Sequence, residues 1–100
     1  MERRVFDRFS CGRSLSIRDL TNSRQYTAVC RDVSGGGVGV QLESPLRLMH
    51  ILELNMPREN ASPLKFKGRA VWQRQIGPVW VAGISFLPSS KLLDTRLFLE

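Results

Sequence analysis

The chain has 100 residues, enough for one domain, and its hydrophobic fraction of 42% is ordinary for a soluble globular protein. A domain of this size buries only part of its surface, so a surface site is expected and a large enclosed catalytic cleft is not. The formal net charge is +6, and 12 of the 15 basic residues are arginine. This excess favours an anionic ligand, because the planar arginine fork binds phosphate or a guanine edge through two hydrogen bonds.

Several classes of protein are disfavoured by what the sequence lacks. It has no apolar run near the roughly 18 residues of a membrane-spanning helix and no apolar signal region, so membrane insertion is not expected. Cys11 and Cys30 have neither metal-ligand spacing nor the number needed for a disulfide framework, which favours a reducing cytoplasm. His50 lies in an apolar run and is expected to be structural. We find no catalytic triad, paired carboxylates or metal cluster, so neither an enzyme nor a cofactor is expected.

Alternation of apolar and polar residues predicts an all-β domain. Turn signals recur at short intervals, as in sandwiches and barrels. The predicted strands are residues 13–20, 26–33, 38–43, 48–56, 64–74 and 79–86.

Within these strands the period of two assigns side chains to faces. Leu48 is expected to point inward at the start of its strand, and Trp72 and Trp80 to pack in the core, with base stacking as the alternative. Gln73 is placed on the outer face. It shares that face with the basic residues of the same strand, Lys65, Lys67 and Arg69.

The breaks between strands are rich in glycine and proline. Residues 35–37 are three consecutive glycines, and the segment from Pro57 to Pro63 is predicted to be a loop. The period changes after Pro88, where Leu93 and Leu97 share one face at a spacing of four residues. A short C-terminal helix is therefore expected, covering one open end of a barrel.

A basic motif precedes the first predicted strand. Arg4 and Arg8, with Arg3 beside them, have a spacing that lets two guanidinium groups bind a phosphate or a guanine from both sides. By spacing alone this motif is weak, because a solvated basic terminus is equally consistent with it.

A second motif runs from Asp32 through Ser34 to Gly37. The carboxylate accepts from a base N–H, the hydroxyl donates or accepts, and the glycines allow close approach to the backbone. The alternative is an ordinary β-turn in which Asp32 and Ser34 bond local N–H groups. In that case Asp32 is expected to hold the turn more firmly than Ser34.

Taken together, the two motifs resemble the PilZ domain family. Arg-x3-Arg is followed about 25 residues later by Asp-x-Ser-x2-Gly, and the segments from Gly68 to Trp72 and from Gly83 to Phe86 resemble the family's paired late strands. The resemblance spans residues 2–86, and the tail fits the family's C-terminal helix.

The resemblance implies a six-stranded antiparallel β-barrel that binds cyclic di-GMP as a bacterial second-messenger receptor. It divides the chain into a flexible ligand-binding segment, residues 1–12, and a barrel, residues 13–100. In the carried-over roles, arginines bind guanines and phosphates, Asp32 and Ser34 bond a guanine edge, and small residues leave room for the ligand. The implied ligand-binding residues are Arg3, Arg4, Arg8, Asp32, Ser34, Gly37 and Gly83.

The expected mechanism is a switch in which the ligand orders the arginine-rich segment over the barrel and so favours an unidentified protein partner. The third arginine, Arg3, predicts two ligands per chain. One alternative is a basic barrel for single-stranded nucleic acid, which is disfavoured because only eight aromatic residues are present, mostly at core positions. The other is a protein-interaction module without a ligand.

Overall fold

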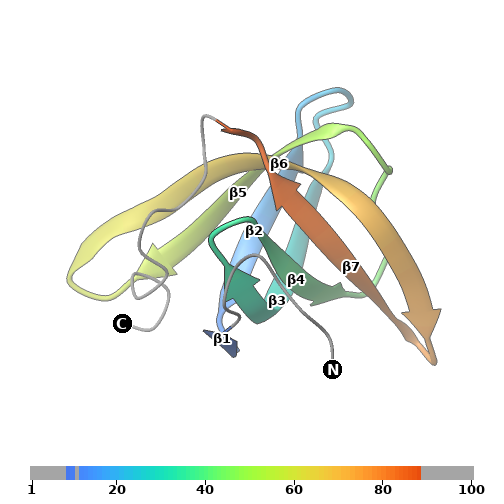
Figure 1. Cartoon of the computed structure of the whole chain (residues 1–100), viewed down its shortest axis with the longest axis horizontal. Coiled ribbons are helices and arrows are strands. Elements are labelled where there is room, and N and C mark those ends of the chain that lie inside the picture. The colour runs from blue at the N-terminus through green and yellow to red at the C-terminus, as the bar shows by residue number, and fades with distance from the viewer. Residues whose placement is uncertain (1–8, 11, 89–100) are drawn as a thin grey trace.

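The computed structural model describes residues 9–10 and 12–88, which form one antiparallel sheet (Figure 1). No helix in this described part is long and apolar enough to cross a membrane. The strands are β1 (Phe9–Ser10), β2 (Ser14–Asp19), β3 (Gln25–Ser34), β4 (Gly37–Leu42), β5 (Ile51–Arg58), β6 (Ala61–Ile76) and β7 (Val79–Phe86).

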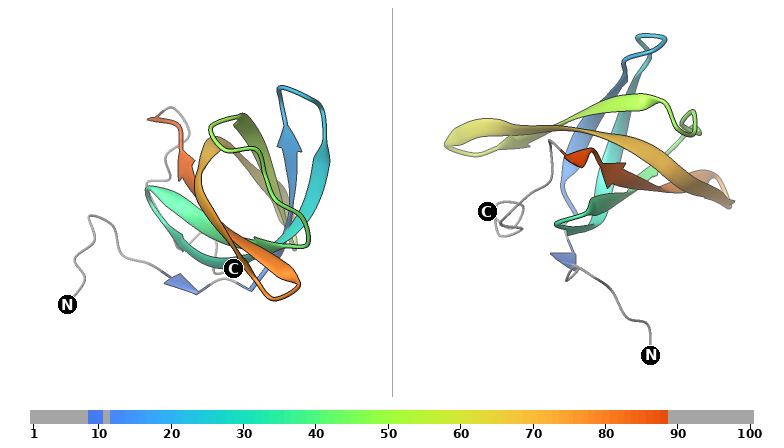
Figure 2. Two further views of the ribbon diagram at one scale, coloured as in Figure 1. Left: turned by 90° about the vertical axis from the view of Figure 1, so that its right-hand side faces the viewer. Right: turned by 45° about the horizontal axis from the view of Figure 1, so that its top comes forward.

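Six of these strands close into a barrel, which confirms the predicted fold. They lie in the order β3, β2, β5, β6, β7, β4, and β4 pairs with β3 to complete the ring (Figure 2). The short β1 pairs with the far end of β3, beyond β2. Residues 9 and 10 therefore form a strand within the segment 1–12 that was expected to be flexible. The predicted C-terminal helix lies outside the described residues.

The barrel interior is filled by alternate side chains of the strands, as the period of two predicts. Ile17 of β2 and Leu52, Leu54 and Met56 of β5 are completely buried. Phe66 and Phe86 meet edge to face, with ring centroids 4.7 Å apart. Trp80 is half-buried and packs against this core, as expected.

The connection from β4 to β5 differs from the prediction. β5 begins at Ile51 rather than at residue 48, because residues 43–50 cross one end of the barrel before pairing resumes. Leu48 is consequently 46% exposed, and its predicted inward position is wrong. The crossing is held by His50, whose Nδ1 lies 2.8 Å from Oδ2 of the buried Asp19, in agreement with a structural role for this histidine.

The predicted loop from Pro57 to Pro63 is instead the end of a long hairpin. β5 and β6 remain paired to Arg58 and Ala61, and only residues 59 and 60 turn. The register shifts between Met56 and Arg58, so Pro57 lies at a bulge, where a residue without an N–H is tolerated.

Candidate functional site

Two β-bulges determine which side chains reach the outer surface. In β3 the register shifts between Cys30 and Asp32. Before this shift the even-numbered side chains face the core, whereas after it Val33 does. Asp32 and Ser34 are therefore directed outward, although continued alternation from Cys30 would have placed them in the core.

The bulge in β6 does the same for a tryptophan. The register shifts between Ala70, which is buried, and Trp72, which is 47% exposed. The predicted core position of Trp72 is therefore wrong. Gln73 turns inward instead of outward, and its amide bonds both the N–H and the carbonyl of Leu46, each at 2.9 Å.

The residues that the bulges turn outward lie in one row across four strands. Asp32 of β3 is opposite Gly39 of β4, Gly39 is opposite Gly83 of β7, and Gly83 is opposite Trp72 of β6. A carboxylate and an indole thus stand at the two ends of a floor formed by two glycines.

Each glycine of this floor is covered by the side chain beside it. A Cβ added to Gly39 would lie 2.7 Å from Oδ1 of Asp32, and one added to Gly83 would overlap the indole of Trp72. Any larger residue at either position would push the carboxylate or the indole away. The glycines therefore fix the placement of both groups.

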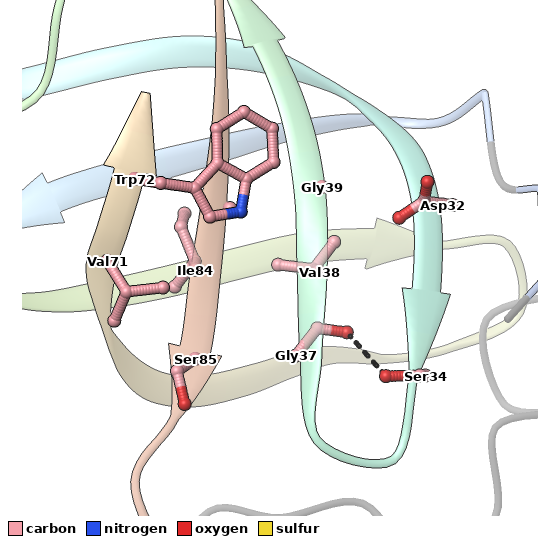
Figure 3. Close-up of a pocket in the computed structure, with 10 residues that line it drawn as sticks. Asp32, Ser34, Gly37, Val38, Gly39, Val71, Trp72, Ile84 and Ser85 are labelled. Carbon is pink, nitrogen blue, oxygen red and sulfur yellow. Dashed lines mark hydrogen bonds between the residues drawn. The ribbon is translucent and has the colours of Figure 1, made fainter. Parts of the chain in front are cut away.

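This arrangement encloses a shallow hollow of about 160 Å³ on the outside of the barrel, which we call the glycine-floored hollow. Figure 3 shows Asp32 and Trp72 on opposite sides of it, with β4 and β7 between them. The lining residues are Asp32, Ser34, Gly37, Val38, Gly39, Val71, Trp72, Gly83, Ile84 and Ser85.

The turn between β3 and β4 closes one end of the hollow. The hydroxyl of Ser34 accepts from the N–H of Gly36 at 3.3 Å. It donates to the carbonyl of Gly37 at 3.5 Å, the bond drawn in Figure 3. These bonds show that Ser34 takes part in holding the turn, and the relative weight of Asp32 and Ser34 there stays a prediction. A Cβ at Gly37 would overlap the carbonyl oxygen of Ile84, so this glycine also permits the close approach of β4 to β7.

The structure thus brings together Asp32, Ser34, Gly37 and Gly83, four of the seven predicted site residues. The other three, Arg3, Arg4 and Arg8, lie outside the described residues. The chain enters the described part beside the hollow, because Phe9 pairs with Val33 and Ser10 with Asp32.

Sequence reasoning missed Gly39 and assigned Trp72 to the core. A signal for the bulge in β3 was nevertheless available, because an aspartate in core phase two residues after Cys30 conflicts with burial. Within the described residues there is no group of three or more His, Cys, Asp or Glu that could hold a metal ion.

Solved structures share this fold at low sequence identity. The PilZ domain of YcgR from Escherichia coli, solved with c-di-GMP, matches with a TM-score of 0.70 and 19% identity over 89% of this chain and 81% of that one. MotI of Bacillus subtilis, an inhibitor of motility, matches at 0.72 and 15% over 99% and 49%. PlzA of Borreliella burgdorferi, solved with c-di-GMP, matches at 0.68 and 14% over 96% and 39%.

The chain spans less than half of MotI and of PlzA, so the likeness to them concerns one domain of each. No curated protein sequence matches this chain significantly. The model of the PilZ domain family matches residues 2–98, nearly the whole chain. This match supports the expectation of a receptor module rather than an enzyme. It also confirms the resemblance inferred from the motifs, and the chain therefore belongs to the PilZ domain family.

Proposed function

We propose that this domain is a receptor for cyclic di-GMP. The observation that carries the proposal is the glycine-floored hollow, which presents a carboxylate, a hydroxyl and an indole beside the point where the arginine-rich segment joins the barrel. Family membership and the solved complexes of YcgR and PlzA with c-di-GMP support it.

The chemistry of the hollow suits one guanine base. The carboxylate of Asp32 accepts from guanine N–H donors, the Ser34 hydroxyl bonds the same base, and the Trp72 indole offers a stacking face. A volume of about 160 Å³ holds part of one nucleotide, so the remainder of the ligand lies across the open surface. There Arg4 and Arg8 are proposed to bind phosphate oxygens and the O6 and N7 acceptors of guanine.

The proposed output is the ordering of residues 1–8 over the barrel. Because β1 already attaches this segment beside Asp32, only a short length of chain has to be ordered when the ligand binds. The ligand neutralises the arginines and closes them over the hollow, which creates a surface that a protein partner recognises. A reducing cytoplasm is the proposed location, because two cysteines in the whole chain do not make a disulfide framework.

Isothermal titration of the chain with cyclic di-GMP tests the proposal directly. We expect binding that weakens about tenfold or more in Asp32→Asn, because a hydrogen bond to a charged group is lost. Glu43→Gln, which removes a carboxylate outside the hollow, serves as the control and should bind like the wild type. An absence of binding in the folded wild type, or tighter binding of a single-stranded oligonucleotide, would contradict it.

We also propose that two ligand molecules bind per chain. Two arginines serve the two phosphates and two guanines of one ligand, and Arg3 supplies the charge that offsets repulsion from a second, stacked molecule. Titration should give a ratio near two in the wild type and near one in Arg3→Leu. A wild-type ratio of one at low salt would leave Arg3 as an ordinary surface charge.

A further inference from the structure

A second feature of the barrel lies at the end of β4, which is shorter there than the neighbouring strand β3. β4 pairs with β3 from Gly37 to Leu42, whose partner is Ala28, while β3 itself starts three residues earlier, at Gln25. The pairing of β4 with β7 ends at the same place, with Leu42 opposite Trp80. Beyond Leu42 the sheet therefore lacks one strand, and we call this opening the β4 gap.

The backbone of β3 directs hydrogen-bonding groups toward this gap. Its even-numbered residues bond toward β2 and β1, as shown by the bonds of Cys30 with Gly12 and Arg13 and by the bond from the Asp19 N–H to the Arg24 carbonyl. In an antiparallel strand the bonding direction alternates from one residue to the next. The N–H and C=O groups of Gln25 and Thr27 are thus directed into the β4 gap.

The chain that leaves β4 contributes Glu43 and Ser44 to the lining of the gap and then turns toward β6. Leu46 is held by the two 2.9 Å bonds to the Gln73 side chain on β6, so the connection is drawn away from β3. What remains is a groove of about 520 Å³, in which Val29 is 42% exposed. Its lining residues are Arg24, Gln25, Tyr26, Thr27, Ala28, Val29, Gln41, Leu42, Glu43, Ser44 and Val79.

We propose that the β4 gap is a docking site for an extended segment of a partner protein, which adds to β3 as a strand in place of the missing part of β4. Strands lie about 4.8 Å apart, and main-chain bonds supply the affinity in this mode of recognition. An apolar side chain of the segment packs on Val29 and Val79, and an acidic one faces Arg24. The charged lining residues of the groove are Arg24 and Glu43, so the acidic side chain is placed at Arg24, and the net charge of +6 attracts an acidic partner to the domain as a whole.

This site is separate from the glycine-floored hollow, because the two share no lining residue. The docking proposal is therefore independent of the proposed binding of cyclic di-GMP, and each of the two is tested by a different experiment.

The test uses the whole chain labelled with 15N and an acetylated, amidated probe peptide, Glu-Val-Thr-Val-Glu. We expect the peptide to shift the amide signals of Gln25, Thr27 and Val29. The same peptide N-methylated at alternate residues should bind about tenfold more weakly or worse, because the main-chain donors are blocked. Equal binding of both peptides, or unmoved signals at millimolar peptide, would overturn the proposal.

Charge reversal provides matched variants. Arg24→Glu should weaken binding of the peptide about threefold to fivefold, the effect of losing one exposed ion pair. Arg74→Glu makes the same charge change on exposed β6, outside the groove, and should have no more than a small effect. Equal weakening by both variants would mean general attraction to a basic domain and overturn the site. Shifts of the same amides on raising the protein concentration alone would show that a second copy is the occupant instead.

Discussion

Two aspartates lie near opposite ends of β3, and their carboxylates differ in burial: Asp19 is the last residue of β2, bonded next to the start of β3, and Asp32 belongs to β3 itself. Asp19, whose backbone N–H bonds the carbonyl of Arg24 just before β3, is completely buried. Its carboxylate accepts from the N–H groups of Thr21 at 2.8 Å and Asn22 at 3.3 Å, and it also contacts His50. Asp32, at the other end, is half-buried and stands at the edge of an open hollow. The first carboxylate is enclosed by its own chain, whereas the second is partly exposed at a place where a ligand can reach it.

The electrostatics of Asp19 follow from its burial and its hydrogen bonds. Burial alone raises the pKa of its carboxyl group, but the hydrogen bonds from His50, Thr21 and Asn22 outweigh that effect and leave the pKa below its usual value of 3.8. The charged form is therefore the one that the fold stabilises. The comparison predicts that changes at Asp19 alter stability and changes around Asp32 alter binding.

The largest effect is expected from Asp19→Ala. It removes the acceptor of two backbone N–H groups and the partner of His50, so the free energy of unfolding should fall by about 3 kcal/mol. Urea denaturation measures this loss. Asp32→Ala, the matched change at the other end of β3, should cost less than about 1 kcal/mol. Equal losses in the two variants would refute the contrast between the carboxylates.

Arg4→Ala and Arg8→Ala are expected to lower the affinity for the ligand and to leave stability unchanged, the reverse of Asp19→Ala. Each removes charge-assisted hydrogen bonds to the proposed ligand, worth about 1.5–3 kcal/mol, so affinity for cyclic di-GMP should fall roughly tenfold to a hundredfold. The urea midpoint should stay at its wild-type value. Titration curves that match the wild type in both variants would remove the arginines from the site.

Trp72→Ala should weaken binding by about 1–3 kcal/mol if the indole stacks on a base. Stability should change little, because nearly half of this side chain is exposed. Fluorescence provides a second readout in Trp80→Phe, which leaves Trp72 as the single tryptophan of the chain. Emission that does not respond to saturating cyclic di-GMP in this variant would place the ligand away from the indole.

Low pH should reveal how much the charged carboxylate of Asp19 contributes to stability. Because the folded-state pKa of Asp19 is below its unfolded value, its contribution to stability is complete well above pH 3.8 and declines as the pH falls through and below this value. Urea denaturation between pH 5 and pH 2.5 should show a smaller decline in Asp19→Asn than in the wild type. Parallel curves would mean that other carboxylates dominate the response to acid.

The period of two predicted the strands and their core side chains, and the resemblance to the PilZ domain family supplied the closed barrel. Ile17, Leu54 and Ile84 lie where alternation puts them. The two motifs likewise identified Asp32 and Ser34, since their chemistry is visible in the residue types. Positions beyond the bulges were harder to predict from the sequence, because a single inserted residue moves every later side chain on its strand to the opposite face.

Trp72 illustrates why this part of the site was missed. Its strand alternates regularly from Leu64 to Ala70, and nothing in the residue types marks the shift that follows. The shift is specified by long-range pairing, in which Gly83 offers the indole a bare backbone on which to lie. Such complementarity between β6 and β7 is a property of the assembled sheet and not of either segment alone.

The smallest effect is expected from Ser34→Ala, and it tests how stability and binding are divided within the hollow itself. The two hydrogen bonds of this hydroxyl are long, at 3.3 Å and 3.5 Å, and the side chain is half-buried, so their loss should lower stability by about 0.5–1 kcal/mol. Ser34→Thr keeps the hydroxyl and should retain most of that stability. If Ser34 only holds the turn, Ser34→Ala loses stability while affinity for cyclic di-GMP remains near the wild-type value. If the hydroxyl also bonds the ligand, as proposed, affinity falls as well, by about threefold to tenfold. An Ala variant that melts like the wild type would show that the backbone, and not Ser34, holds the turn between β3 and β4.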